Sequence, residues 1–441
     1  MESIFGAYDV RGIFGKDLTL DKCELIGKAV GTLIDSDEFV VGYDTREHSP
    51  KVYEAFVKGI TSTGLDVVSV GMVPNPVAYF TGFNNKLPGA YITASHNPPE
   101  YNGIKFFHKD GTSFVNELQK IKEIANSNKF KEGAGNVAEV DYAITDYEEY
   151  LYKRITIDKK MKIAAECFNG SSALILKQLL NYYDIELTPL NMIPKGDFGG
   201  LRPEPKGANL ENLKKAVLDN KSDFGIAFDG DSDRGVFIDD KGKEYMADIP
   251  SIIFIKDILS KTKGKIIAAA DCPTEIGKIV EENGGSIHWT RVGHSFIEEA
   301  VVKEKALYGF EQSSHFYFKT FYPFSDGFLA MLRMAEILSK SNENFSSIAD
   351  KIKINPMEKF YIKCKDHQHK KTVMQKIREE FPEGKDYADG IKIMINDVEW
   401  ALIRTSQTNP EININIEAKN EKRLKELVKK YSKIVEEKIN G

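Results

Sequence analysis

Residues 224–238, Phe-Gly-Ile-Ala-Phe-Asp-Gly-Asp-Ser-Asp-Arg-Gly-Val-Phe-Ile, decide the fold class of this 441-residue chain. Two apolar stretches, 224–228 and 236–238, flank a short loop that carries three aspartates. Apolar runs of this length, bounded by glycine and charged residues, are typical of buried strands. We therefore expect a strand, a polar loop and a return strand in this part of the chain.

The same pair of strands with a polar loop recurs at residues 90–106 and 306–318. In all three places the pair follows a strand, a helical stretch and a second strand, which lie at 39–70, 163–187 and 266–289. Strands that alternate with helices at this spacing predict βαβ units and mostly parallel sheet. We infer three related α/β domains, each with one polar loop at the end of a strand, where the ligands of open α/β sheets bind.

The chain follows a different pattern from about residue 353 onward. Short apolar segments predict an antiparallel sheet, and a final charged helix has one apolar face, which we expect to pack on that sheet rather than on a partner. The fold class is therefore α/β, with three related domains of mixed, mostly parallel sheets followed by an α+β domain. The predicted domains are 1–142, 143–243, 244–352 and 353–441.

The composition is that of an ordinary globular protein. The 60 Lys and Arg residues against 66 Asp and Glu give a net charge of −6, whereas binding to nucleic acid or an anionic membrane would favour a basic excess. No uncharged apolar stretch approaches the roughly 18 residues that span a bilayer. The four cysteines form no Cys-x-x-Cys pair, and the first residues lack the features of a signal peptide. We expect a cytoplasmic protein with reduced cysteines.

Asp229, Asp231 and Asp233 place three carboxylates at alternate positions of one loop. Charges this close repel by up to ~4 kcal/mol per pair at partial burial, so a cation among them is expected. Hard oxygen ligands select Mg²⁺, Mn²⁺ or Ca²⁺. A Ca²⁺-binding EF-hand fits poorly, because Arg234 and Asp240 stand where that loop needs glycine and glutamate. The alternative to a metal site is a solvated acidic turn.

Two further loops carry groups that suit phosphate chemistry. Residues 93–98, Thr-Ala-Ser-His-Asn-Pro, place Ser95 beside a histidine. Ser95 could be a nucleophile, although the Gly-x-Ser-x-Gly elbow of hydrolases is missing, and a simple ST-turn is the alternative. Residues 404–410, Arg-Thr-Ser-Gln-Thr-Asn-Pro, combine a guanidinium with hydroxyl and amide groups, which together suit a phosphate dianion.

With these loops, the chain resembles the α-D-phosphohexomutase superfamily, most closely its phosphomannomutase/phosphoglucomutase branch. The matching segments follow one another over nearly the whole length, at 7–12, 93–98, 228–234, 290–295, 311–315 and 404–410. The resemblance implies four domains around a central cleft. Three of them are related α/β domains, and the last closes over a sugar phosphate.

The resemblance also implies a reaction. In such enzymes the serine matching Ser95 carries a phosphoryl group, and the aspartates matching Asp229, Asp231 and Asp233 hold one Mg²⁺ against it. The phosphoryl group passes to a hexose phosphate, and the resulting hexose 1,6-bisphosphate returns its other phosphate to the serine. We therefore expect an isomerase that interconverts hexose 1-phosphate and hexose 6-phosphate, of mannose and/or glucose.

The remaining site residues are expected from the same resemblance. Arg11, Lys105 and Arg234 would offset phosphate charge, and Lys105 and His315 would transfer the proton of the sugar hydroxyl. A plain salt bridge is the alternative for Arg11, and a structural histidine for His315. Substrate binding is expected of Tyr8, His294, Ser295, Glu311, Ser313, Arg404, Ser406, Gln407 and Thr408.

The chain departs from the family's pattern at several positions. Ser232 and Ser314 replace glycines. Asn413 and Asn415 stand where many relatives have an arginine, and Asp271 where some have a lysine. These losses of positive charge weaken the predicted grip on the distal phosphate.

The identity of the sugar stays open. Gln312 points to the phosphoglucosamine mutase branch, whereas residues 7–9 and 293–295 point to the phosphomannomutase/phosphoglucomutase branch. Phosphoglucosamine mutase and phosphopentomutase are thus alternatives. A metal-dependent phosphatase with Asp229 as its nucleophile, or a non-catalytic sugar-phosphate binder, is favoured less. We expect sugar phosphates as partners, no nucleic acid or membrane, and a monomer or homodimer.

Overall fold

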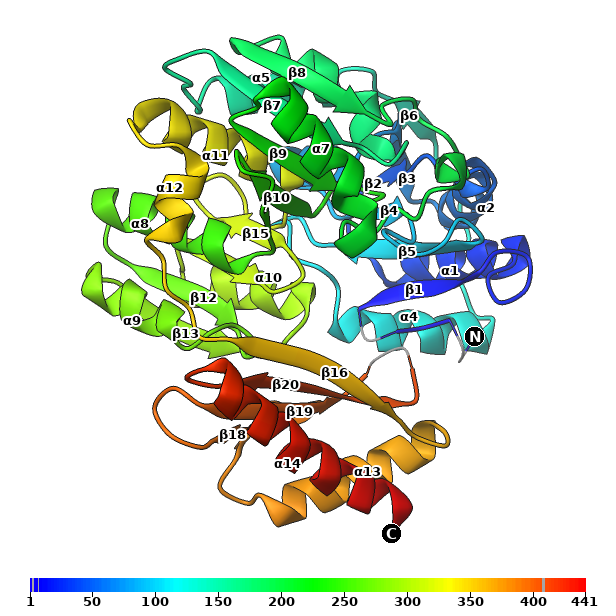
Figure 1. Cartoon of the computed structure of the whole chain (residues 1–441). Coiled ribbons are helices and arrows are strands. Elements are labelled where there is room, and N and C mark those ends of the chain that lie inside the picture. Colours follow the sequence, from blue (N-terminus) through cyan, green and yellow to red (C-terminus); the bar gives the residue numbers. More distant parts are fainter. Residues whose placement is uncertain (2–3, 7, 407–408) are drawn as a thin grey trace.

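The computed structural model describes residues 1, 4–6, 8–406 and 409–441, and its strands form four sheets. In Figure 1 the first sheet lies at the right, the second at the top, the third at the left and the fourth at the bottom. No helix in the described part of the chain is long and apolar enough to cross a membrane. Gln407 and Thr408, both predicted to bind substrate, lie outside the described residues.

The first sheet comprises β1 (Asp9–Ile13), β2 (Glu38–Tyr43), β3 (Asp66–Met72), β4 (Gly89–Ile92), β5 (Tyr101–Phe107) and β6 (Val137–Glu139), in the order β1-β5-β4-β2-β3-β6. Successive residues of β2 enter different cores, Val41 one and Val40 the other. One core includes side chains of α1 (Leu20–Leu33), α2 (Ser49–Thr61) and α4 (Asn116–Ser127). The other includes side chains of α3 (Asn75–Asn85) and α5 (Ala143–Tyr152). The sheet is therefore covered on both faces, as expected for parallel strands.

The second sheet comprises β7 (Met161–Glu166), β8 (Ile185–Leu190), β9 (Phe224–Phe228), β10 (Gly235–Asp239) and β11 (Glu244–Tyr245), with helices α6 (Leu176–Leu180) and α7 (Glu211–Asn220). The third comprises β12 (Lys265–Ala269), β13 (Ser286–Thr290), β14 (Tyr308–Glu311) and β15 (His315–Phe318). The helices of this third part are α8 (Asp248–Lys261), α9 (Glu275–Glu282), α10 (His294–Lys303), α11 (Gly327–Lys340) and α12 (Phe345–Asp350).

One strand order underlies all three of these sheets, as β3-β2-β4-β5, β8-β7-β9-β10 and β13-β12-β14-β15. In each case the first three strands are parallel and the fourth is antiparallel. The predicted threefold repeat with mixed, mostly parallel sheets is confirmed. The domain boundaries stay a prediction, and the β10–β11 pairing spans the one drawn between residues 243 and 244.

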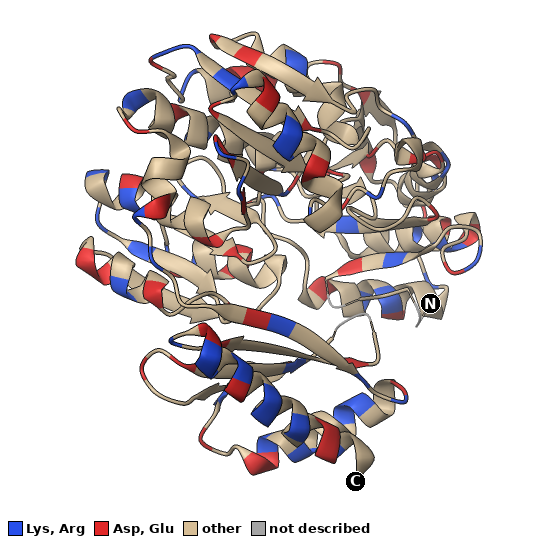
Figure 2. Cartoon of the chain, viewed as in Figure 1, with Lys and Arg blue, Asp and Glu red and all other residues tan. Residues whose placement is uncertain are grey.

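The fourth sheet comprises β16 (Met357–Lys363), β17 (Lys385–Asp386), β18 (Gly390–Met394), β19 (Trp400–Thr405) and β20 (Glu411–Glu417), with helices α13 (His367–Glu380) and α14 (Glu421–Asn440). All its strand pairs are antiparallel, as predicted. Leu424, Leu427 and Tyr431 of α14 are buried in the same core as the sheet. Figure 2 shows lysine, arginine and acidic residues intermingled along the rest of α14.

The first three sheets share an apolar core that the fourth sheet does not join. One continuous core contains side chains from the first, second and third sheets, whereas the fourth sheet has a core of its own. A small cluster of Ala270, Trp400 and Leu402 joins the third sheet to the fourth. Polar contacts complete this junction: Glu417 accepts hydrogen bonds from the Thr274 backbone N–H at 2.9 Å, and Lys392 Nζ donates to the Ala270 carbonyl oxygen at 2.7 Å.

Candidate active site

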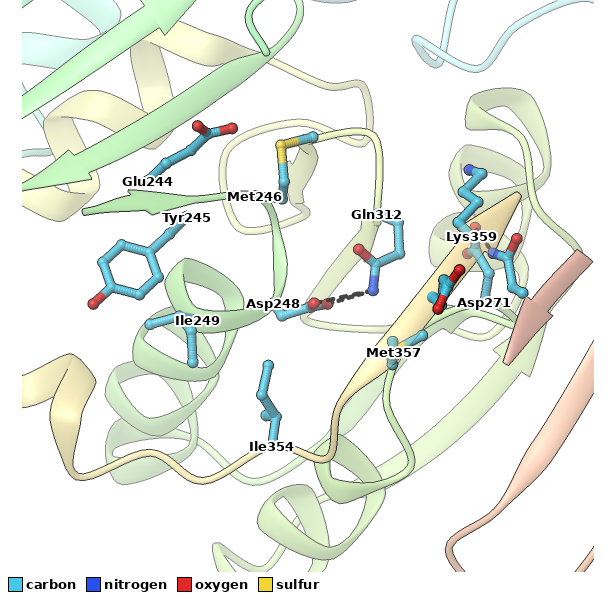
Figure 3. A pocket seen from close by; sticks show the side chains of 12 residues that line it. Glu244, Tyr245, Met246, Asp248, Ile249, Asp271, Gln312, Ile354, Met357 and Lys359 are labelled. Carbon is cyan, nitrogen blue, oxygen red and sulfur yellow. Dashed lines mark hydrogen bonds between the residues drawn. The ribbon is translucent and has the colours of Figure 1, made fainter. Parts of the chain in front are cut away.

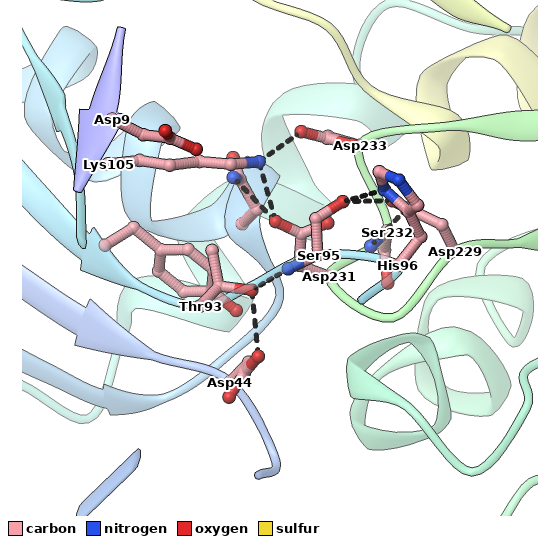
Figure 4. Close-up of polar contacts among 12 residues, drawn as sticks. Asp9, Asp44, Thr93, Ser95, His96, Lys105, Asp229, Asp231, Ser232 and Asp233 are labelled. Atoms are coloured by element: carbon pink, nitrogen blue, oxygen red, sulfur yellow. Dashed lines mark hydrogen bonds and ion pairs between the residues drawn. The ribbon is translucent and has the colours of Figure 1, made fainter. Parts of the chain in front are cut away.

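The loop between β4 and β5 holds Ser95 in a left-handed backbone conformation, with φ at +50°. This conformation costs roughly 1–2 kcal/mol for a residue other than glycine, so the surroundings must enforce it. The Ser95 N–H donates to Thr93 Oγ1 at 2.8 Å, and the Thr93 hydroxyl donates to Asp44 at 2.8 Å. Figure 4 shows this chain of contacts leading from Asp44 to Ser95.

Arg46, which follows β2, fixes the rest of the Ser95 loop. Its side chain is fully buried. Its two terminal nitrogens donate to the carbonyl oxygens of Ser95, Asn97, Pro98 and Tyr101 at 2.7–3.0 Å, and Nε donates to Asp44 at 3.1 Å. All the guanidinium nitrogens are therefore used on one loop and its support. Neither Asp44 nor Arg46 was predicted as a site residue. The available signal was a charged pair directly after a buried strand.

Ser95 faces the acidic loop between β9 and β10 (Figure 4). Its hydroxyl donates to Asp229 Oδ2 at 2.6 Å. Asp229, Asp231 and Asp233 are buried, and one carboxylate oxygen from each lies within 4.8 Å of the others. Burial, together with the charges of Asp231 and Asp233, raises the pKa of Asp229 well above its ordinary value. The structure thus brings together, from two different sheets, the serine and the three aspartates that the sequence singled out.

Lys105, on β5, spans two of these carboxylates. Its Nζ donates to Asp231 Oδ2 at 2.8 Å and to Asp233 Oδ2 at 2.7 Å. Burial alone would lower the pKa of Lys105, but the two aspartates outweigh it and raise that pKa. Asn75, which sequence reasoning missed, donates from its side chain to Asp231 at 3.3 Å. Lys105 is therefore a fixed cation in this arrangement.

The acidic loop also fits a divalent cation. Asp231 Oδ1 and Asp233 Oδ1 are buried and have no hydrogen-bond partner among the described residues. Three carboxylates supply the hard oxygen ligands that Mg²⁺ prefers. No other group of three potential metal ligands this close together occurs in the described part of the chain.

Arg234 and His315 connect the acidic loop to the third sheet. Arg234 Nε donates to His315 Nε2 at 3.0 Å and lies 3.7 Å from Asp229 Oδ2. Because His315 accepts at Nε2, its neutral ring carries the proton at Nδ1, which lies 3.8 Å from Asp233 Oδ1. Burial and the charge of Arg234 lower the pKa of His315 well below its ordinary value. His315 is therefore neutral at physiological pH.

Arg11, on β1, lies at the edge of the Ser95 loop. Its guanidinium donates to Asn97 Oδ1 at 3.0 Å and pairs with Asp9 at 2.6 Å. β1 pairs with β5, so Arg11 and Lys105 project from adjacent strands of one sheet. The pairing with Asp9 means that the salt bridge considered as the alternative role of Arg11 is present alongside its contact with the loop.

The predicted sugar-binding residues surround the loop between β14 and β15. Glu311 accepts hydrogen bonds from Ser313 Oγ at 2.6 Å and from the Gly293 N–H at 3.0 Å. The ring of His294 lies between Tyr8, at 4.4 Å between centroids, and His315, at 5.9 Å. Ser295 is buried, and its hydroxyl has no partner among the described residues. This loop is thus held beside Arg234 and the acidic cluster.

Lys105, His294 and His315 line a small cavity. Its volume is about 10 Å³, roughly the space of one water molecule. Glu298 of α10 also lines it and accepts a hydrogen bond from the Ser113 N–H at 2.9 Å. Burial raises the pKa of Glu298 to about 8. Sequence reasoning missed this carboxyl, because its place in a helix gives no local sign of its neighbours.

Arg404 and Ser406 lie on a separate part of the molecule, in and after β19. Arg404 Nη1 is 3.6 Å from Asp389, and Lys370 Nζ donates to the Ser406 carbonyl oxygen at 2.5 Å. Among the described residues, no hydrogen bond or ion pair joins Arg404 or Ser406 to the cluster around Ser95. Lys370 instead fixes the loop within the fourth sheet's own unit.

Comparisons with known families agree with this geometry. Three family models described as phosphoglucomutase/phosphomannomutase α/β/α domains I, II and III match residues 2–132, 145–242 and 247–354. The chain belongs to the phosphoglucomutase/phosphomannomutase family.

Individual relatives cover almost the whole chain. A probable phosphoglucosamine mutase of Methanopyrus kandleri is 32% identical, over 99% of this chain and 98% of the relative. A phosphoglucomutase/phosphomannomutase of Thermococcus kodakarensis is also 32% identical, with both chains fully covered. The crystal structure of a phosphoglucomutase/phosphomannomutase family protein from Burkholderia thailandensis superposes with a TM-score of 0.91 at 26% identity, covering 99% of this chain and 98% of that one. The family is clear, whereas the relatives' names differ in the sugar.

Proposed function

We propose, on the premise of this membership, that the chain interconverts hexose 1-phosphates and hexose 6-phosphates with Ser95 as the phosphoryl carrier. The supporting observation is the 2.6 Å contact between Ser95 Oγ and Asp229 across two sheets. It places a serine oxygen at the edge of a buried, metal-compatible acidic cluster. A hexose 1,6-bisphosphate is the intermediate that such an enzyme forms.

Asp229, Asp231 and Asp233 would hold Mg²⁺, with an oxygen of the phosphoserine as a further ligand. Bound there, the ion would neutralise charge on the phosphoryl group during transfer. Three carboxylates and a phosphoserine of about −2 still leave roughly −3 beside one divalent ion. Arg11, Lys105 and Arg234 supply three fixed positive charges that offset this remainder.

The chain's own groups then position the reacting atoms. A sugar hydroxyl oxygen forms a bond to phosphorus while the bond from phosphorus to Ser95 Oγ breaks. Lys105 is held as a cation by Asp231 and Asp233, so His315 is the base. Its acceptor nitrogen, Nε2, takes the hydroxyl proton after the sugar hydroxyl replaces Arg234 Nε as the donor to that nitrogen. In the second half of the reaction the bisphosphate gives its other phosphate to Ser95, and the proton returns to the sugar oxygen.

We propose glucose and mannose as sugars. One serine must serve both ends of the bisphosphate, so the sugar must bind in two orientations. Glu311 and Ser313 would contact the hydroxyls near the axis that relates these two orientations. Such contacts would not distinguish glucose from mannose, which differ in configuration at C2. Glucosamine is the second candidate, favoured by Gln312 next to Glu311 and by the name of the Methanopyrus relative.

Two measurements test this proposal. Incubation with glucose 1,6-bisphosphate should leave an acid-stable phosphate on the peptide that contains Ser95. A phosphate on Asp229, labile in alkali, would instead support a phosphatase. Assays of the 1-phosphates of glucose, mannose, glucosamine and ribose, side by side, then decide the sugar.

A further inference from the structure

A second pocket lies where residues of the second, third and fourth sheets meet, and Gln312 lines it (Figure 3). Its volume is about 350 Å³. Ile249, Ile354 and Met357 give it apolar walls. Four acidic residues, Glu244, Asp248, Asp271 and Glu358, line it together with the amides Gln312 and Asn415 and one lysine, Lys359.

The polar lining is rich in hydrogen-bond acceptors. Gln312 Nε2 donates to both oxygens of Asp248, at 2.8 and 3.0 Å, and Asn415 Nδ2 donates to Asp271 Oδ2 at 3.4 Å. Asp271 and Asn415 are each at least 97% buried, and Oδ1 of each has no hydrogen-bond partner among the described residues. A buried acceptor without a donor is energetically unfavourable, so these oxygens call for a ligand that donates.

Positive charge is scarce around these acceptors. In the described part of the chain, neither Asp248 nor Asp271 forms an ion pair. Lys359 lines the pocket, and Lys392 is engaged by the Ala270 carbonyl and lies over the Trp400 ring at 3.9 Å. Burial raises the pKa of Asp248 to about 7, against the hydrogen bond from Gln312, and the charge of Asp271 adds to the rise. Four carboxyl groups thus line the pocket against the single lysine Lys359.

The chemistry of the lining distinguishes between possible cations. A divalent metal would need several carboxylate ligands close together, and the described residues offer such a group only at Asp229, Asp231 and Asp233. An ammonium group needs no such cage, because it brings one positive charge and three donors on a single nitrogen. Separated acceptors on a partly apolar wall suit it. We propose that this pocket binds a primary ammonium group.

Two sources can supply that group. Gln312 lines the pocket, and its two neighbours in the chain, Glu311 and Ser313, are the residues proposed to bind the sugar. The pocket is also close enough to the sugar site for electrostatic coupling, because the charge of Asp271 adds to burial in raising the pKa of Glu311. A hexosamine phosphate bound at the active site could therefore place its amino group here, an assignment that rests on the proposed function. A free small amine that binds at the junction of the third and fourth sheets does not depend on it.

The test compares calorimetric binding of glucosamine 6-phosphate, glucose 6-phosphate and propylamine to the full chain with Mg²⁺. The two sugars differ only in the ammonium or hydroxyl at C2. The variants are Asp271→Asn and Asp248→Asn, which remove a charge and keep the shape. Glu282→Gln is the matched control, because Glu282 is exposed on α9 and does not line the pocket. Thermal unfolding shows that each variant is folded, and Asp248→Asn, at a less buried position, stands in if Asp271→Asn fails.

We expect glucosamine 6-phosphate to bind about tenfold more tightly than glucose 6-phosphate, and both aspartate variants to lose that difference while Glu282→Gln keeps it. Equal binding of the sugars, with propylamine binding that both aspartate variants lose, also supports the pocket and identifies a free amine. The proposal is overturned if glucosamine 6-phosphate binds no more tightly than glucose 6-phosphate and propylamine does not bind. It is also overturned if the tighter binding of glucosamine 6-phosphate, or the binding of propylamine, persists in the aspartate variants. A second Mn²⁺ ion that binds the unmodified chain and is lost in Asp271→Asn would likewise overturn it. Failure of both sugar phosphates to bind the unmodified chain would instead refute the mutase proposal, and propylamine would still report on the pocket.

Discussion

The first three sheets and the fourth differ in how they are held. The first three share one apolar core, and in the candidate active site serine, aspartate, lysine, arginine and histidine side chains from all three meet at 2.6–3.0 Å. The fourth sheet has its own core and contacts the third through a small cluster and several polar bonds. The difference indicates a division of work. Groups fixed by the shared core suit the chemical step, and the fourth sheet's loop suits binding.

Replacing Ser95 should cause the largest loss of activity among the variants that compare the two regions. Ser95→Ala removes the proposed phosphoryl carrier, so turnover should fall by a factor of at least about 10³. Binding of hexose phosphate should change little, because it depends on the other loops. Steady-state assays and calorimetry measure the two quantities, and Ser127→Ala, at an exposed position on α4, is the control. Substantial turnover in Ser95→Ala would refute the carrier role.

Neutralising one metal ligand should have the next largest effect. Asp231→Asn removes a charged ligand of a cation that demands near-octahedral geometry, so more Mg²⁺ should be needed and the maximal rate should fall about 10–100-fold. Rates measured over a range of Mg²⁺ concentrations test this, with Asp219→Asn on α7 as the exposed control. Full activity in the presence of a chelator would contradict the prediction.

The fourth sheet should respond differently. Arg404→Ala removes a fork of donors for the distal phosphate, so we expect KM to rise about tenfold in both directions of the reaction, with a smaller change in kcat. Arg404→Lys should be intermediate, because it keeps the charge and loses the fork. A defect in kcat alone would place Arg404 in the chemical step and remove the distinction between the two regions.

The smallest expected effect concerns stability. Ser314 has φ at +66°, and its buried hydroxyl has no partner among the described residues. Ser314→Gly relieves both costs and loses some chain entropy, so the free energy of unfolding should rise by about 1 kcal/mol. Denaturant unfolding measures the change, and Ser313→Gly, which lacks a positive φ, should bring no gain. An unchanged or lowered stability would show that this loop is not strained.

Much of the fold could be predicted because its signals are local and repeated. The apolar strands at 224–228 and 236–238, and their counterparts, lie where the periodicity placed them. Ser95 and the three aspartates could be singled out because each follows a strand of a repeated unit, whereas a role for His315 was expected only from the family resemblance. Strand β1 was not predicted, because Asp9–Ile13 mixes charged and apolar residues and becomes a strand through pairing with β5.

The supporting residues of the site escaped prediction for a related reason. Arg46 and Asn75 act on loops that lie far away in sequence, and Glu298 lines the small cavity beside Lys105 only once α10 is packed. Their local sequence carries no mark of these partners. The acidic pocket that Gln312 lines was also not predicted, since it forms where residues of three sheets meet.

The buried guanidinium of Arg46 has a consequence for anyone who wishes to transplant this chemistry. Residues 93–98 form a short peptide, yet four carbonyl oxygens in and beside it are held by a side chain about fifty residues earlier. Grafting the hexapeptide alone onto another scaffold would leave those oxygens free to choose other partners, and the serine would lose its orientation. A graft should therefore transfer the loop together with Arg46 and the end of β2 that precedes it. A combinatorial library should vary both segments together.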